Sequence, residues 1–229
     1  MNIQGLQKLT LLDYPGHTAC TVFLKSCDFR CPFCHNSLLL ESSCPDHSTD
    51  SDLLDFLKKR IGLLDGVCFT GGEPLLHKDI GGLISKVKEL GYLVKLDTNG
   101  YHPEELDSLI NSKSVDYVAM DIKNSPKKYA STCGRVNIDI LRIYKSIDIL
   151  RSSDIEYEFR TTVVNGIHEE ADFVDIGQMI NGAENYYLQC FVDRDSVLQK
   201  GLEAPSEQQL KKYRDIVRPY VQNVQIRGI

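Results

Sequence analysis

Residues 27–36 read CDFRCPFCHN and place three cysteines, Cys27, Cys31 and Cys34, in a C-x3-C-x2-C pattern. Three thiolates in one short loop can hold three corners of a metal cluster, and they leave the fourth corner without a local ligand. A cluster that only carries electrons has a fourth cysteine, and a structural zinc ion also takes four protein ligands. The pattern therefore favours an iron–sulfur cluster with one open iron atom, where chemistry can take place.

Zinc is the main alternative at this loop, with His35 as a fourth ligand, although adjacent residues rarely both reach one tetrahedral ion. The next cysteine, Cys44, lies in a polar stretch that is typical of a loop, and its role is left open. Cys20, Cys68 and Cys190 lie in apolar runs, which predicts small core residues with reduced thiols. The cysteines do not resemble the framework of a secreted, disulfide-rich protein.

The composition is that of an ordinary globular protein. The chain has 229 residues, of which 42% are hydrophobic and 25% are charged, so one substantial domain is expected. The net charge of -6 comes from interspersed acidic and basic residues, which argues against a nucleic-acid surface. The first residues do not resemble a signal peptide, and no apolar stretch reaches membrane-spanning length. We therefore expect a cytoplasmic protein without nucleic-acid or membrane partners.

Short apolar runs alternate with longer segments of helical periodicity. The runs predict strands at residues 19–24, 67–70, 93–96, 115–120, 156–164 and 186–191, with one more at 221–227. Helices are predicted at residues 52–63, 79–90, 103–111, 139–152, 169–180 and 206–217. Pro103 suits a first helical position, and Ser206 with Gln209 fits a capping box. The alternation indicates an α/β fold with a parallel sheet, either a barrel or a doubly wound sheet.

Polar or glycine-rich groups follow four successive predicted strands. The cysteine loop follows the first strand, GGEP at 71–74 the second, DTNG at 97–100 the third, and DIK at 121–123 the fourth. Any one of the three shorter groups could be an ordinary turn. In parallel α/β folds, however, functional groups collect at the carboxyl ends of the strands, so these four are expected to meet on one rim.

With these motifs in place, the sequence resembles the radical S-adenosylmethionine (SAM) enzymes, through CxxxCxxC after the first strand and GGEP after the second. CHN at 34–36, DTNG and MDIK narrow the likeness to activating enzymes of glycyl radical proteins. LQKLTLLDYPGHTACTVFL and YEFRTTVV are most similar to anaerobic ribonucleoside-triphosphate reductase activating proteins. The resemblance implies a partial (β/α)6 TIM-like barrel in a single domain, with an extension at 1–18, the barrel core at 19–191 and a helix and strand at 192–229.

The resemblance also implies which residues hold the cofactors. Cys27, Cys31 and Cys34 would hold a 4Fe-4S cluster, whose open iron would be chelated by the amino and carboxylate groups of SAM. The other implied SAM contacts are Phe33 beside the adenine, Asn36 at the ribose, and Gly71, Gly72, Glu73 and Pro74 at the ammonium group.

On the later strands, Lys123 would pair with the SAM carboxylate and Asp121 with the ribose or a nearby cation. Arg160 and Thr162 would line the substrate side and the adenine, although a salt bridge at a strand end is an equal alternative for Arg160. A monovalent cation beside SAM would be surrounded by Asp97, Thr98, Met120 and Asp121. Gln189 or a neighbour stands where pyruvate formate-lyase activases carry a histidine, which makes that partner less expected.

The implied activity is reductive cleavage of SAM, with flavodoxin or ferredoxin as the electron donor. The resulting 5'-deoxyadenosyl radical would install a glycyl radical on a large partner enzyme, for which anaerobic ribonucleotide reductase is the leading candidate. No side chain need act as a general base, so the five histidines in turns or near helix starts are predicted as surface or capping residues: His17, His47, His77, His102 and His168.

Two other functions remain open at this stage. One is a small-molecule radical SAM enzyme similar to 7-carboxy-7-deazaguanine synthase, which would need no protein partner. The other is a non-catalytic module that binds an iron–sulfur cluster or zinc. A barrel of six main strands would leave a lateral opening wide enough for a protein loop, which favours the activase, whereas a closed barrel of eight strands would oppose it.

Overall fold

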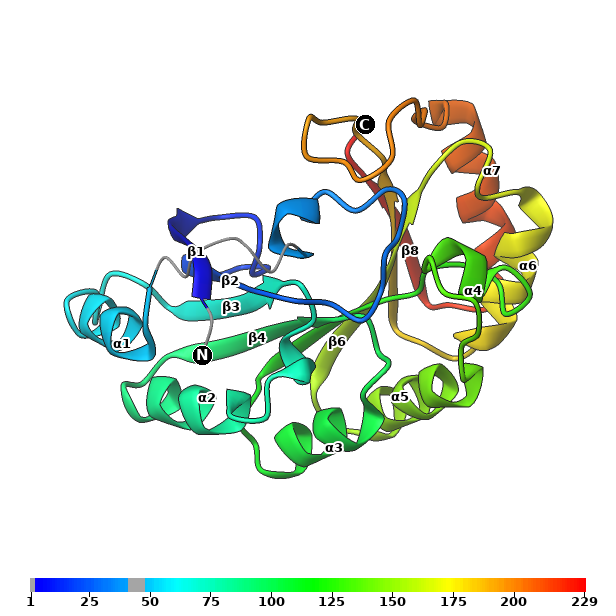
Figure 1. The fold of residues 1–229 in the computed structure, drawn as a ribbon. Coiled ribbons are helices and arrows are strands. Elements are labelled where there is room, and N and C mark those ends of the chain that lie inside the picture. The colour runs from blue at the N-terminus through cyan, green and yellow to red at the C-terminus, as the bar shows by residue number, and fades with distance from the viewer. Residues whose placement is uncertain (1–2, 41–47) are drawn as a thin grey trace.

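The computed structural model describes residues 3–40 and 48–229, and in these residues one eight-stranded sheet curves into a half-barrel (Figure 1). The strands lie side by side in chain order. They are β1 (Ile3–Thr10), β2 (Ala19–Leu24), β3 (Gly66–Gly71), β4 (Leu93–Thr98), β5 (Tyr117–Asp121), β6 (Glu156–Val163), β7 (Asn185–Cys190) and β8 (Asn223–Arg227). From β2 to β8 every neighbouring pair is parallel, whereas β1 runs antiparallel to β2.

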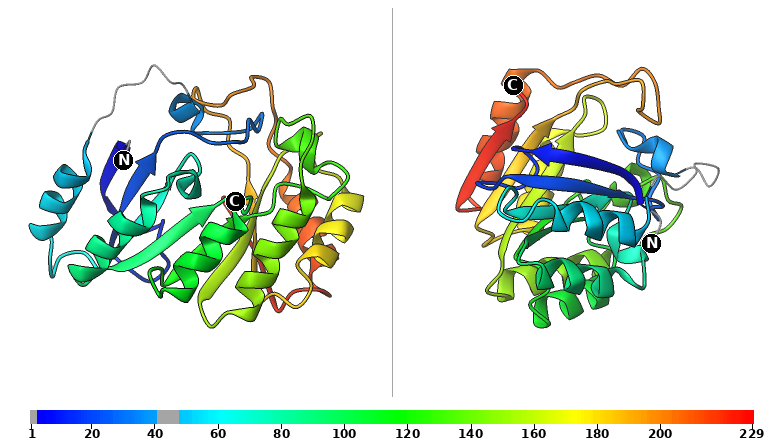
Figure 2. Two further views of the ribbon diagram at one scale, coloured as in Figure 1. Left: turned by 60° about the horizontal axis from the view of Figure 1, so that its bottom comes forward. Right: turned by 90° about the vertical axis from the view of Figure 1, so that its left-hand side faces the viewer.

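Helices connect the parallel strands and cover the outer, convex face of the sheet (Figures 1 and 2). The α-helices are α1 (Asp50–Lys58), α2 (Ile80–Glu89), α3 (Pro103–Asn111), α4 (Tyr129–Thr132), α5 (Ile140–Ser152), α6 (Glu170–Met179) and α7 (Glu207–Val217). Two short 3-10 helices are η1 (Ser37–Leu40) and η2 (Pro74–Leu76). The hydrophobic core therefore lies between the helices and the sheet. The helices do not cover the concave face of the sheet.

The local sequence explains these elements. In α2, Ile80, Leu83, Ile84 and Val87 form one buried face at helical spacing. Helix α7 begins with the predicted capping box, in which Ser206 accepts a hydrogen bond from the backbone of the third helical residue. Proline occupies the first turn of α3, as predicted.

The six strands predicted for the barrel core correspond to β2–β7, and the predicted last strand is β8. Four of the described elements were not predicted: β1, which forms within the expected N-terminal extension, the short helix α4, and the two 3-10 helices η1 and η2. The first helix was predicted to reach residue 63 but ends at Lys58, because Leu63 N and Leu64 N donate to Arg60 O and close a turn. The fold class is confirmed as one α/β domain with a parallel sheet.

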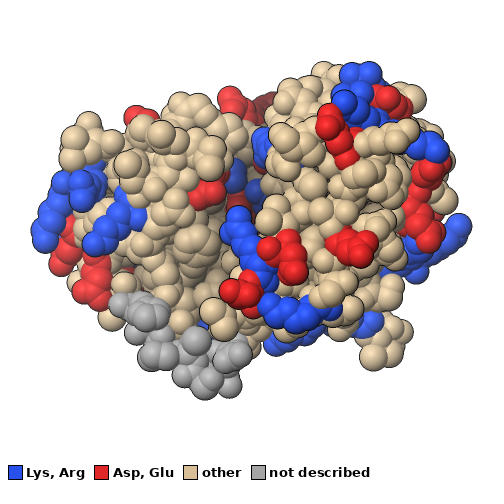
Figure 3. All heavy atoms as spheres, turned by 90° about the horizontal axis from the view of Figure 1, so that it is seen from above, with Lys and Arg blue, Asp and Glu red and all other residues tan. Residues whose placement is uncertain are grey.

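The sheet does not close on itself. In the part of the chain that the structure describes, β1 and β8 are the two ends of the sheet and share no ladder. Viewed from the open side, the surface is hollowed between the two halves of the molecule, and acidic and basic atoms are visible in the hollow (Figure 3). None of the described helices combines the length and apolar character needed to cross a membrane.

A buried ion pair attaches β8 to the rest of the sheet. Glu158 on β6 is 1% exposed, and Arg227 on β8 donates to both of its carboxylate oxygens at 2.8 Å. Tyr117 on β5 donates its hydroxyl to the same carboxylate at 2.8 Å. The terminal strand is thus held by a bidentate contact in the interior of the half-barrel.

We predict that Arg227→Ala lowers the free energy of unfolding in urea by about 2–3 kcal/mol, because it leaves Glu158 buried without its main partner. This loss is smaller than the roughly 3–5 kcal/mol typical of a fully buried pair, because Arg227 is itself partly exposed to solvent. The double variant Glu158→Gln with Arg227→Ala should recover at least half of the loss, since residue 158 then carries no buried charge. A single variant as stable as the wild type would contradict this role.

Candidate active site

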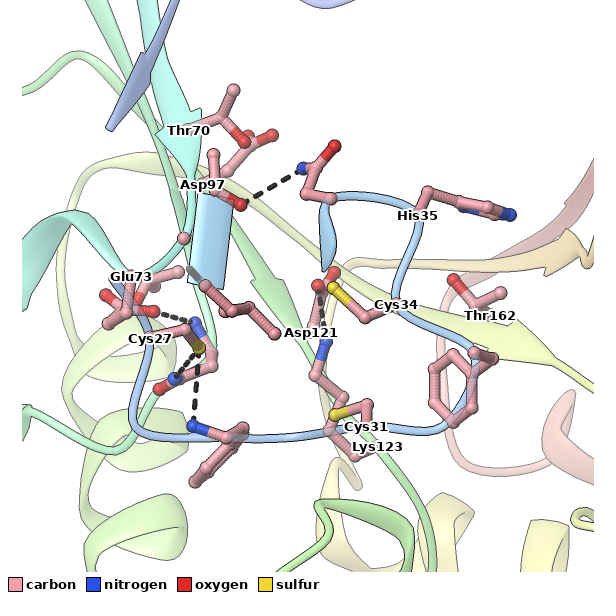
Figure 4. Close-up of a pocket in the computed structure, with 18 of the residues that line it drawn as sticks. Cys27, Cys31, Cys34, His35, Thr70, Glu73, Asp97, Asp121, Lys123 and Thr162 are labelled. Carbon is pink, nitrogen blue, oxygen red and sulfur yellow. Dashed lines mark hydrogen bonds and ion pairs between the residues drawn. The ribbon is translucent and has the colours of Figure 1, made fainter. Parts of the chain in front are cut away.

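A cavity of about 210 Å³ opens at the carboxyl ends of the strands (Figure 4). All of the residues predicted from the sequence to bind cofactors line it, except Pro74 and Met120. They are Cys27, Cys31, Phe33, Cys34, Asn36, Gly71, Gly72, Glu73, Asp97, Thr98, Asp121, Lys123, Arg160 and Thr162. The four groups expected to meet on one rim therefore do so.

The cysteine loop presents three free thiols to this cavity. Cys27, Cys31 and Cys34 form no disulfide, and Figure 4 shows their sulfur atoms around a common space. The loop is shaped by its own backbone, because Cys34 N donates to Cys31 O at 3.0 Å. The backbone N–H of Phe29 donates to the Cys27 sulfur at 3.4 Å, a contact that partly offsets the rise in the pKa of this thiol caused by burial.

The spread of these thiols bears on the choice between zinc and a cluster. Among the described residues, no three Cys, His, Asp or Glu side chains converge where one metal ion could bind. Three sulfur ligands distributed around a cavity suit the separate corners of a cluster better than the single point of a tetrahedral ion. Cys44, another possible ligand, lies outside the described residues.

Gly71 and Gly72 bring the end of β3 against the chain that leads into the cysteine loop. A Cβ on Gly72 would lie 1.8 Å from Ser26 O, and one on Gly71, whose φ is 113°, would lie 2.4 Å from Leu24 N. Gly72 N and Glu73 N donate to Leu24 O and Ser26 O at 2.8 Å. The close approach that glycine permits here is therefore to the chain's own backbone. It fixes the position at which the cysteine loop starts, directly before Cys27.

Glu73 is a buried carboxylate that organises the adjacent strand end. It is 1% exposed, and it accepts hydrogen bonds from Leu75 N at 3.1 Å, Thr98 Oγ1 at 2.8 Å and Asn99 N at 2.7 Å. Within the described part of the chain, no lysine or arginine forms an ion pair with it. Burial raises the pKa of Glu73 to about 7, although these hydrogen bonds oppose the rise.

Lys123 and Asp121 form a charged pair on the other side of the cavity. Lys123 Nζ donates to Asp121 at 2.9 Å, and Arg160 Nε donates to the second oxygen of the same carboxylate at 2.9 Å. Burial alone would raise the pKa of Asp121, but Arg160 and Lys123 outweigh it and lower the value to about 2. Arg160 thus forms the salt bridge that the sequence left as an alternative, and it also lines the cavity.

The remaining predicted residues divide into two groups. Asn36 donates its side-chain amide to Gly71 O at 3.0 Å and so attaches the cysteine loop to the end of β3. Phe33 is buried, and Thr162 lies at the wall of the cavity. Pro74 and Met120 are buried outside the cavity lining, where Pro74 begins η2 and Met120 packs beside a glycine.

The residues that contact Cys27 and its neighbour Asp28 were not predicted from the sequence as site residues. Asp28 accepts from Asn99 Nδ2 at 2.9 Å and lies 3.2 Å from His102 Nε2 and 3.8 Å from Arg135. The Asn99 amide also approaches the Cys27 sulfur at 3.9 Å. The asparagine of the DTNG group was a possible signal, whereas an acidic residue between two cysteines has no distinctive pattern.

One further residue differs from expectation, and one was not assigned a role from the sequence. His168 was predicted at the surface but is 2% exposed, with one ring nitrogen accepting from Val164 N and the other meeting Lys123 O. Burial lowers its pKa, so the ring is held neutral beside the site. Cys133, at the end of α4, is fully buried and hydrogen-bonded to Cys31. His47 lies outside the described residues.

The segment that follows β7 packs over the cysteine loop. Leu198 N donates to Cys34 O at 3.3 Å, Gln199 N donates to Pro32 O at 2.9 Å, and Ser37 Oγ donates to the backbone of Ser196 at 2.5 Å. These contacts hold the segment against the cysteine loop.

The arrangement fits the two cofactors that the sequence implies. The three thiols can ligate a cluster, and the remaining charges match a zwitterionic amino acid, with Glu73 available for an ammonium group and Lys123 for a carboxylate. The ammonium group of such a ligand would give the buried Glu73 carboxylate a cationic partner, which it lacks among the described residues.

Comparison with known sequences agrees with this site. The radical SAM superfamily matches residues 21–179. A protein of Methanocaldococcus jannaschii named as a glycyl-radical enzyme activating enzyme is 34% identical over 235 residues, which cover 99% of this chain and 96% of that protein. The pyruvate formate-lyase-activating enzyme of Clostridium pasteurianum is 31% identical over 127 residues, or 53% of this chain and 52% of that enzyme.

Comparison with solved structures agrees with the fold. SuiB of Streptococcus suis bound to S-adenosylmethionine superposes with a TM-score of 0.70 over 91% of this chain, at 13% sequence identity. The match covers 52% of the SuiB chain, so the chain spans about half the length of SuiB. At this level of identity the likeness concerns the fold alone.

We predict that Glu73→Gln changes how stability depends on pH. Because the folded pKa of Glu73 lies above its ordinary value of 4.5, its contribution to stability is complete below about pH 4.5 and is lost as the pH rises through about 7. Between about pH 5 and about pH 8, the free energy of unfolding should therefore shift in favour of the variant by up to about 3 kcal/mol. Denaturant unfolding across this range measures it.

Glu89→Gln, at an exposed position on α2, serves as the matched control and should run parallel to the wild type. Parallel pH profiles for Glu73→Gln and the wild type would show that the buried carboxylate carries no such penalty.

We predict that Gly72→Ala destabilises the chain by about 3 kcal/mol and removes most of its bound iron, because the new Cβ meets the Ser26 backbone that leads into the cysteine loop. Gly82→Ala is the control, since a Cβ there meets nothing within 4 Å and alanine favours the helix. Urea unfolding and iron content measure both effects. Equal iron content in the two variants would contradict the packing argument.

Proposed function

Because the chain belongs to the radical SAM superfamily, and within it to the glycyl-radical enzyme activating enzymes, we propose that it activates an anaerobic ribonucleoside-triphosphate reductase. Membership of this family makes the chain an enzyme and implies a 4Fe-4S cluster and SAM as its cofactors. The observation that carries the proposal is one cavity that is lined by three free thiols, by a lysine and by a buried carboxylate without a lysine or arginine partner among the described residues. A cluster and an amino-acid ligand account for all three together.

In this proposal, Cys27, Cys31 and Cys34 would hold the cluster and leave one iron open to SAM. Glu73 would orient the ammonium group of SAM and Lys123 its carboxylate. Each of these charges lies on a different strand end, so the two contacts fix both ends of the amino-acid moiety. Phe33, Asn36 and Thr162 line the remainder of the space that the nucleoside would occupy, and the ends of β3 and β4 contribute backbone.

The bound cofactors supply a one-electron reductive cleavage that yields a 5'-deoxyadenosyl radical able to take a hydrogen atom from a glycine of the partner. The chain itself supplies orientation and protection. The hydrogen bonds from Phe29 N and Asn99 to Cys27 hold one ligand in place, and the segment after β7 covers the loop. Exclusion of water protects a reactive radical from side reactions. A cytoplasmic flavodoxin or ferredoxin is proposed as the electron donor.

Two features support a protein partner. The half-barrel is open between β1 and β8 in the described residues, which leaves room for a loop of another chain. A relative that matches almost the whole chain is named as an activating enzyme. The choice of the reductase over pyruvate formate-lyase rests on the sequence, in which Gln189 or a neighbour stands where pyruvate formate-lyase activases carry a histidine.

We predict that the anaerobically reconstituted, reduced and SAM-loaded protein produces a glycyl radical on an anaerobic ribonucleotide reductase and a much weaker signal on pyruvate formate-lyase. Electron paramagnetic resonance of the two mixtures measures this. Cys34→Ala is the control and should abolish the signal, because the cluster loses a ligand.

The other outcomes are equally informative. A radical on pyruvate formate-lyase alone would assign a different partner within the same family. Rapid SAM cleavage that depends on a purine-like small molecule, with no radical on either protein, would support the small-molecule alternative and contradict the proposed function.

A further inference from the structure

Asp97 and Asp121, the two carboxylates predicted to bind a monovalent cation, already contact cationic side chains. Lys95 Nζ donates to one oxygen of Asp97, and an Arg160 nitrogen lies 3.4 Å from the other. Asp121 accepts from Arg160 Nε at 2.9 Å and from Lys123 Nζ at 2.9 Å. Each of the four carboxylate oxygens therefore has a protein cation beside it.

The other two predicted ligands are also engaged. Thr98 Oγ1 donates to Glu73 at 2.8 Å and accepts from Gly100 N at 3.1 Å. The Met120 side chain packs against the Gly100 position, and its thioether is a soft ligand that does not suit a hard cation. The residues present consequently do not fit a bound monovalent metal ion.

Charge balance leads to the same result. If Lys123 serves the SAM carboxylate, two carboxylates, Asp97 and Asp121, remain opposite two cations, Lys95 and Arg160. Among residues 3–40 and 48–229, the only other carboxylate within 4.0 Å of Arg160 is that of Glu158, and it has its own partner in β8. The group is thus neutral without an added ion.

Lys95 is built into the interior and does not reach in from the surface. Its side chain is 2% exposed, and its ammonium lies 3.9 Å from Cys68 Sγ and 5.9 Å from the centre of the Tyr117 ring. Burial alone would lower its pKa, but Asp97 outweighs this and raises it, so the ammonium stays charged.

A second cavity, of about 510 Å³, shares Asp97 and Arg160 with the cofactor cavity and includes Lys95. Lys95 therefore approaches Asp97 from the side away from the cofactor.

We infer that the Lys95 ammonium, with the Arg160 guanidinium, occupies the role of a monovalent cation, so that the chain binds SAM without one. Lys95 is a positioning residue: it acts through Asp97, which lines the cofactor cavity. The part of the inference that concerns SAM rests on the proposed function. The part that concerns the ion pair does not, because a buried carboxylate needs a counter-cation whatever the cavity binds.

The test compares the cluster-loaded wild type and Lys95→Met in sodium, potassium and tetramethylammonium chloride at equal ionic strength. The wild type should unfold at one temperature and bind SAM with one affinity in all three salts. In tetramethylammonium, which is too large to enter, Lys95→Met should unfold about 4 °C lower or more and bind SAM about tenfold more weakly. Sodium or potassium should restore both. Lys86→Met, at an exposed lysine of α2, should behave as the wild type.

A wild type whose unfolding or SAM affinity changes between sodium and tetramethylammonium would overturn the inference. A Lys95→Met variant that is equally weak in all three salts, or unaffected in all three, would also overturn it. If Lys95→Met does not fold, the double variant Lys95→Met with Asp97→Asn removes both charges and should fold with no cation dependence; failure of this variant as well would overturn the charge argument. Absence of SAM binding by the wild type would instead contradict the proposed function, and the unfolding measurements would still decide the role of Lys95.

Discussion

Arg160 donates to Asp121 at 2.9 Å and faces Asp97 at 3.4 Å, so that one guanidinium joins strands β4, β5 and β6 inside the half-barrel. In a closed eight-stranded barrel this interior would be filled with layers of branched apolar side chains. Here the sheet is open at its two end strands in the described residues, and the concave face carries paired charges. Because buried charges must be paired and hydrogen-bonded, the positions of these side chains are tightly determined. The open sheet thus keeps an ordered interior that can also receive a ligand.

The same requirement explains why the two sides of the cavity differ in how their charges are paired. Near Lys123 every acidic oxygen has a protein cation, whereas Glu73, on the opposite wall, has hydrogen-bond donors but no lysine or arginine partner among the described residues. A zwitterionic ligand placed between them would supply an ammonium group to Glu73, and its carboxylate would compete with Asp121 for Lys123. The cysteine loop is held at the same rim by the packing of Gly72 on Ser26 and by the Asn36 amide. In the proposed function, the chain contributes the geometry of the site to the reaction.

Much of this could be predicted from the sequence. Parallel strands expose their carboxyl ends on one edge, so the motifs that follow four successive apolar runs had to meet, and they line one cavity. What the sequence could not give depends on contacts between distant segments. The strand β1 exists because it pairs with β2, and Lys95 stands in the apolar run LVKL, where nothing local indicates that its charge points inward. His168 follows a turn, as surface residues do, but its ring is buried by hydrogen bonds to Val164 and Lys123. Gly71 and Gly72, which were predicted to contact a ligand, line the cavity, and the sequence did not show that they also pack against the backbone of Leu24 and Ser26.

The central claim is that three cysteines of this chain hold a cluster whose open iron binds SAM. Electron paramagnetic resonance of the anaerobically reconstituted and reduced protein, recorded before and after addition of SAM, tests it most directly. The account predicts four irons per chain and a cluster signal whose shape changes when SAM is added. A protein that takes up zinc in place of iron, or a cluster signal that SAM leaves unaltered, would contradict it.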